Sequence, residues 1–235
     1  MADERLVPPD PPSIGRALRE AASDFYFNSW RLVPANLVWS ALLIVVILGT
    51  TIWLPAVLLS ALLALPVAGM HRMAALLHRG DPAGFGDFVN GMRKFFGPAL
   101  LVGSLGVLLA VVFSANVYLG LEIGGVLGWS FSAFALYGDI GLAMFLVAAW
   151  PILVDPFRED LPVRSRLRLA ALVNLARPGR MFAVTLLIVA LLLISTALFA
   201  ALLTVSVAFV SLVATRYVLP AADRLEGRET KRVVG

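Results

Sequence analysis

Apolar stretches of about 20 residues recur along this 235-residue chain, and they constrain its fold more than any other feature. A helix of this length and composition can cross the hydrocarbon core of a bilayer. Apolar residues make up 60% of the sequence and charged residues 14%, with a mean hydropathy of +0.90. A soluble domain carries roughly a quarter charged residues, so the composition predicts an all-α, polytopic membrane protein.

The last apolar block, residues 181–215, decides the number of spans because it contains no charged residue. At about 1.5 Å per residue, a single helix through it would be over roughly 50 Å long, against a hydrocarbon core of about 30 Å. We therefore expect two short helices with a turn near residues 198–201. The predicted membrane domain covers residues 34–220, with six spans at about 34–53, 56–77, 98–119, 130–154, 181–198 and 201–219.

Residues 1–33 are predicted to form a cytoplasmic leader. This leader lacks an apolar core of about 7–15 residues, which argues against a cleavable signal peptide. Ser13 can cap a short amphipathic helix lying in the membrane interface. The first span is expected to begin at Pro34, because proline is tolerated in a first helical turn. Between the two, four aromatic residues form an expected interfacial belt: Phe25, Tyr26, Phe27 and Trp30.

The 19 Lys and Arg residues set the predicted orientation. They lie in the leader, at the junction of the second and third spans, at the junction of the fourth and fifth spans, or at the C-terminal end. The three opposite connections carry none. Cytoplasmic loops are enriched in Lys and Arg, so both termini are expected in the cytoplasm, with residues 221–235 as a tail.

An Asn followed three residues later by an Arg precedes each outward-going span. The pairs are Asn28 and Arg31, Asn90 and Arg93, and Asn174 and Arg177. Each pair lies on one helix face. One interpretation is three parallel repeats, each an interfacial helix plus a two-span hairpin. The other is that Arg anchors helix ends at the interface and that the Asn positions are coincidental. These six residues are candidates for a cytoplasmic interface.

Four segments between residues 36 and 96 carry a family resemblance. They read NLVW at 36–39, PVAGM at 66–70, LLHRGDP at 76–82 and DFVNGMRKFF at 87–96. In this order they resemble the YesL-like family of bacterial integral membrane proteins, a family of unknown function. The resemblance implies a protein of the bacterial inner membrane, often associated with carbohydrate uptake systems. It implies no catalytic or ligand-binding residue.

Asp139 is the ionisable residue that most invites a functional hypothesis, because it falls inside a predicted span. One interpretation is a proton or cation site, or a polar contact to Asn116 or Ser114 of the preceding span. The other places Asp139 at the outer interface, with the membrane core of span four beginning near residue 138. Both interpretations stay open on the sequence alone.

Glycines at 120, 124 and 128 have the spacing of small residues in packed membrane helices. Their expected position beyond the third span, next to Glu122, favours a glycine-rich loop instead. His71 and His78 lie about 10 Å apart along one helix face, too far for a shared metal ion. We expect both histidines to be interfacial helix residues.

Arg164, Arg166 and Arg168 form a basic cluster that Arg177 and Arg180 extend. Such a cluster binds anionic lipid head groups or a cytoplasmic partner, or it only enforces topology. The sequence lacks Cys and the common catalytic motifs, so we expect no enzyme, no cofactor and no metal.

Three functions fit these observations. The first is a non-catalytic component of a solute transport system, whose partners are the lipid bilayer and other membrane transport subunits. The second is a membrane scaffold whose basic helices dock lipid or a soluble partner. The third is a small autonomous transporter that uses Asp139. Nothing in the chain indicates a nucleic-acid partner.

Overall fold

The computed structural model describes residues 11–227, which are almost entirely helical and include no strand. Six helices in this part of the chain are long and apolar enough to cross a membrane. They cover Ile14–Ile52, Pro55–Arg79, Phe96–Ile123, Gly125–Val154, Pro178–Ala197 and Phe199–Leu225. The prediction of an all-α, polytopic fold with six spans is confirmed.

The first span is the C-terminal part of a single long helix, α1 (Ile14–Ile52). Ser13 caps it as expected, since its hydroxyl accepts a hydrogen bond from the Arg16 backbone N–H at 3.3 Å. The predicted helix boundary at Pro34 is wrong, because α1 continues through this proline. Inside the helix, Pro34 lacks the N–H that would donate to residue 30, and its ring crowds the carbonyl of that residue. At about 1.5 Å per residue, the 39 residues exceed the bilayer core, so the first turns of α1 must extend beyond it.

The second span changes helix type along its length. It begins as a 3₁₀ helix, η1 (Leu54–Leu63), and continues as α2 (Ala64–Arg79). The change occurs two residues before Pro66, which has no N–H to donate to residue 62. Gly80 then ends α2 with a φ of 84°. Its N–H donates to the Leu77 carbonyl at 3.2 Å, and the Asp81 N–H donates to the Leu76 carbonyl at 3.0 Å.

A short amphipathic helix, α3 (Phe85–Lys94), leads into the hairpin of α4 (Phe96–Ile123) and α5 (Gly125–Val154). The predicted glycine-rich loop is wrong, because the turn is confined to Gly124 and Gly125, which have φ values of 65° and 64°. Gly120 and Gly128 instead lie in facing helices. A Cβ atom on Gly120 would come within 2.6 Å of the Gly128 carbonyl oxygen. Small-residue packing is therefore found at Gly120 and Gly128, across the hairpin, whereas Gly124 belongs to the turn.

The third hairpin follows the short helices η2 (Pro156–Arg158) and α6 (Val163–Ala176). It consists of α7 (Pro178–Ala197), a break at Leu198, α8 (Phe199–Ala201), the π-helical segment η3 (Leu202–Ser206) and α9 (Val207–Leu225). The predicted turn near residues 198–201 is confirmed. A short helix therefore precedes each two-helix hairpin. In the first of the three it is continuous with the membrane span as part of α1.

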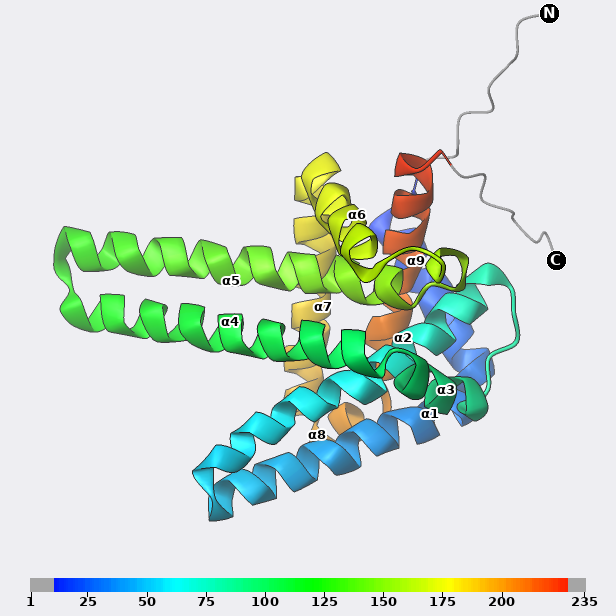
Figure 1. The fold of residues 1–235 in the computed structure, drawn as a ribbon, viewed down its shortest axis with the longest axis horizontal. Helices are drawn as coiled ribbons and strands as arrows, with labels where there is room; N and C mark the ends of the chain where they lie inside the picture. The colour runs from blue at the N-terminus through cyan, green and yellow to red at the C-terminus, as the bar shows by residue number, and fades with distance from the viewer. Residues whose placement is uncertain (1–10, 228–235) are drawn as a thin grey trace, which may run out of the picture.

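The three hairpins share a base and diverge from it (Figure 1). The α4–α5 hairpin, drawn in green, extends away from the others, whereas α9 packs against α1, α2, α5 and α7. In the most apolar stretch of the last span, Phe199–Leu225, 61% of the residues are buried, against 17% in α4 and in α5. Alanines dominate the core around α9, and their small side chains allow close helix approach.

Candidate functional site at the charged base

A buried ion cluster joins the three hairpins at their common base. Arg79, at the end of α2, binds two carboxylates. Its guanidinium lies 2.7 Å from Asp155 Oδ2 and 2.7 Å from Asp223 Oδ2. Two further hydrogen bonds, each 3.1 Å long, make both contacts bidentate. The geometry matches the planar fork that arginine presents to carboxylates.

Arg158 of η2 completes the cluster from the other side. Its guanidinium donates to Asp155, to Asp223 Oδ1 at 2.7 Å and to Glu226 Oε2 at 2.7 Å. The Arg158 side chain is 0% exposed. Burial alone would lower the pKa of this guanidinium, but the carboxylates of Asp155, Asp223 and Glu226 outweigh burial and raise it above its ordinary value. Arg158 therefore stays charged inside the protein.

Local backbone structure places each member of the cluster. The left-handed Gly80 terminates α2 directly after Arg79. Asp155 ends α5 in an extended conformation and accepts a hydrogen bond from the Phe157 backbone N–H, which starts η2. Asp223 lies in the last turns of α9. The cluster thus connects residues that are 76 and 144 positions apart in the chain.

A second layer of polar contacts surrounds the cluster. Arg72 binds Glu159 at 2.6 Å and donates to the Val154 carbonyl at 2.9 Å, and Lys94 binds the same carboxylate. Arg166 of α6 donates to the Leu153 carbonyl. Burial lowers the pKa of the Arg166 guanidinium, and the nearby Glu159 opposes this shift. These contacts tie α2, α3 and α6 to the end of α5.

Within the spans, the Asn36 side chain bonds the backbone at both ends of the π-helical segment η3. Its amide nitrogen donates to the Leu202 and Leu203 carbonyls at 3.2 and 2.9 Å. Its amide oxygen accepts hydrogen bonds from the Val207 and Ala208 N–H groups, both at 3.0 Å. One fully buried side chain therefore satisfies backbone groups that the π-helical segment η3 leaves without regular partners.

His71 of α2 is buried against α9. Its Nδ1 lies 3.0 Å from the Val67 carbonyl and 3.2 Å from Ser211 Oγ. A carbonyl only accepts, so Nδ1 carries the proton and the ring is the Nδ1–H tautomer. His78 lies two helical turns further along α2, at the edge of the ion cluster. No group of three or more metal-binding side chains occurs among residues 11–227.

The structure places the candidate site around Asp139 on the protruding hairpin. Ser114 Oγ donates to Asp139 Oδ2 at 3.3 Å, which is one of the two expected contacts. Asn116 instead donates to the Val112 carbonyl of its own helix at 2.8 Å. Asp139 and Asn116 therefore do not form a common site. The surrounding surface of α4 and α5 is apolar and exposed.

The three Asn-x-x-Arg pairs lie at the base but have different contacts. Asn28 and Asn174 each donate to the carbonyl four residues earlier, at 2.9 Å. Asn90 and Arg93 are exposed on α3. Arg31 donates to the Ala83 carbonyl at 2.8 Å, and Arg177 occupies the N-cap position of α7, where its side chain makes no capping hydrogen bond. The first and third pairs share the asparagine contact, but no described interaction is common to all three pairs.

The basic cluster on α6 is divided by the fold. Arg166 is buried, whereas Arg164 and Arg168 are exposed one turn apart on the outer face.

Sequence reasoning missed the ion cluster of Arg79, Asp155, Arg158 and Asp223. The available signal was the placement of Asp155 and Asp223 at the ends of two otherwise apolar helices. Comparisons of the chain with family models, with curated proteins and with solved structures gave no match.

Proposed function

We propose that this membrane protein is a non-catalytic component of a larger membrane assembly, namely an accessory subunit of a solute transport system. The observation that carries the proposal is the α4–α5 hairpin. Its helices are 28 and 30 residues long, and 17% of the most apolar stretch of each is buried within the chain. The outer faces of this hairpin are free to contact another membrane protein.

The contacts that polar side chains make inside the described spans support an accessory role rather than a solute path through this chain. A path would need polar side chains directed toward a shared opening. Asn36, Ser40 and Ser211 are instead committed to backbone carbonyls of the last hairpin. The charged groups at the base neutralise one another in the ion cluster. The resemblance to the YesL-like family supports the choice of transport, with carbohydrates as the first solute class to examine.

Site-specific photo-crosslinking tests the proposal. A photoreactive amino acid would replace Leu108 or Val111, which are 58% and 60% exposed on α4. The matched control is Leu212 of α9, which is 1% exposed. The proposal predicts that the α4 positions crosslink to a transport subunit and the Leu212 position does not. It also predicts that deletion of the gene lowers uptake of one carbohydrate class.

Two results would overturn the proposal: crosslinks to lipid alone at both α4 positions, and unchanged uptake across a panel of sugars after deletion.

A second candidate, a scaffold that docks a soluble partner or lipid, is favoured by the exposed outer face of α6. There Arg164 and Arg168 are followed by Leu172 and Leu175, which are 45% and 76% exposed. Crosslinks from Arg168 to a soluble protein, with none from α4, would favour this scaffold.

A further inference from the structure

A cavity of about 360 Å³ opens at the base of the first hairpin, between α1 and the connection from α2 to α3. It is lined by Trp30, Arg31, Pro82, Ala83, Gly84 and Phe85. Arg31 is the charged residue of this lining, and the other side chains are aromatic or small. We refer to this cavity as the Arg31 pocket.

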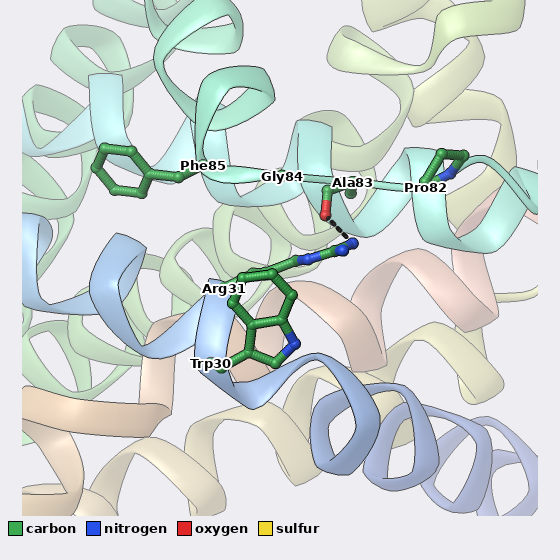
Figure 2. Close-up of a pocket in the computed structure, with 6 residues that line it drawn as sticks. All are labelled: Trp30, Arg31, Pro82, Ala83, Gly84 and Phe85. Carbon is green, nitrogen blue, oxygen red and sulfur yellow. Dashed lines mark hydrogen bonds between the residues drawn. The ribbon is translucent and has the colours of Figure 1, made fainter.

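The Arg31 guanidinium is held in place within the pocket. Its Nη1 donates to the Ala83 carbonyl at 2.8 Å, and its Cζ lies 4.3 Å from the centre of the Trp30 ring. Figure 2 shows the Arg31 side chain between the Trp30 ring and the Pro82–Phe85 connection. The described contacts occupy one edge of the guanidinium and leave its other N–H donors available.

The walls of the pocket are suited to an amphipathic ligand. Trp30 is 68% exposed and Phe85 is 43% exposed, and Tyr26 and Phe27 continue the aromatic surface along α1. Such residues concentrate where a membrane helix meets the headgroup region. The carboxylate of Asp87, the nearest acidic side chain in α3, is bonded to the Gly84 backbone N–H at 2.8 Å.

We propose that the Arg31 pocket binds one anionic phospholipid, with the lipid phosphate on the Arg31 guanidinium and the first part of an acyl chain against Trp30 and Phe85. A guanidinium with a fixed plane can bind two phosphate oxygens at once. The single positive charge of the lining complements a headgroup of net negative charge. A choline headgroup would bring its ammonium group toward Arg31, so phosphatidylglycerol binds better than phosphatidylcholine.

Native mass spectrometry of the full chain, delipidated in detergent and titrated with each lipid, tests the proposal. The wild-type protein should carry one tightly bound phosphatidylglycerol. Arg31→Gln should weaken its binding by about tenfold or more, because a charge-assisted hydrogen-bond pair is lost. Arg93→Gln is the matched control, since Arg93 is an exposed arginine of α3 outside the pocket, and its binding should be unchanged.

Arg31→Lys keeps the charge but not the planar fork, so it should weaken binding by about threefold or more. Equal weakening in the Arg31→Gln and Arg93→Gln proteins would overturn the proposal, because the effect would then reflect overall charge. Wild-type binding by the Arg31→Lys protein would contradict the fork geometry. Displacement of the lipid by inorganic phosphate alone would contradict the assignment to a lipid. Thermal unfolding of each variant confirms that the tested proteins are folded.

Discussion

Arg79 and Asp223, which end the second and sixth spans, form a bidentate ion pair with N–O distances of 2.7 and 3.1 Å. The Arg79 side chain is 5% exposed and that of Asp223 is 2% exposed. Arg79 makes the same kind of pair with Asp155 at the end of the fourth span. One arginine therefore connects an element from each of the three hairpins.

Replacement of Arg79 by Met should destabilise the protein by about 3–5 kcal/mol, because the buried carboxylates of Asp155 and Asp223 would then lose one of their two arginine partners and keep only Arg158. The free energy of unfolding in detergent micelles measures this loss. Arg93→Met is the control, since Arg93 is exposed, and it should change stability by less than about 0.5 kcal/mol. Equal stability of the two variants would show that the ion cluster does not hold the hairpins together.

Replacement of Asn36 by Leu should destabilise the last hairpin by about 3 kcal/mol. It leaves the Leu202 and Leu203 carbonyls and two backbone N–H groups without their partner in an apolar environment. Asn116→Leu serves as the matched control, because Asn116 bonds only the Val112 carbonyl among its described contacts. Hydrogen exchange at residues 199–208 should accelerate in the first variant and not in the second. Unchanged exchange in the Asn36 variant would contradict the assigned role.

Replacement of Gly120 by Ala should separate α4 from α5 and cost about 1–3 kcal/mol, since the new Cβ would lie 2.6 Å from the Gly128 carbonyl oxygen. Gly141→Ala is the control, because outside its own stretch of helix backbone no atom lies within 4 Å of a Cβ at that position. The readout is the rate of disulfide formation between cysteines placed at positions 117 and 132. In the native hairpin these positions are adjacent, because the Ser132 hydroxyl donates a hydrogen bond to the Val117 carbonyl. Similar rates in the two glycine variants would be incompatible with tight packing at Gly120.

Asp139→Asn should leave protein stability nearly unchanged, because the carboxylate contacts only Ser114 among the described residues and lies on the protruding hairpin. If the protein proves to support uptake, the variant should retain that uptake at every pH tested. Loss of a pH-dependent uptake in the folded variant would instead favour an autonomous transporter that uses Asp139.

The sequence predicts the six spans correctly because hydropathy and length are local properties of the chain. The turn at Leu198 follows from the same arithmetic, since 35 uncharged residues cannot form one span. The boundary at Pro34 could not be placed, because a proline that begins a helix and a proline tolerated inside one look alike locally. The glycines at 120 and 128 were equally ambiguous between a loop and close helix packing.

The ion cluster and the contacts of Asn36 could not be predicted for a different reason. Arg79 meets Asp223 across 144 positions, and Asn36 meets Leu203 across 167. Without the fold, each charged residue near a span end is equally explained by topology. The packing of α9 against its neighbours decides which arginines are buried in ion pairs and which face outward, and this packing is not a local property of the sequence.

In the proposed topology, all three hairpin tips lie on one side of the membrane and the charged base lies on the other. Since the chain has no native cysteine, single cysteines at Trp53, Val126, Leu198 and Ser165 can be labelled in intact cells with a membrane-impermeant maleimide. We expect labelling at Trp53, Val126 and Leu198 from outside, and labelling at Ser165 only after the membrane is opened. External labelling at Ser165, or protection of any one tip, would contradict the six-span arrangement with a cytoplasmic base.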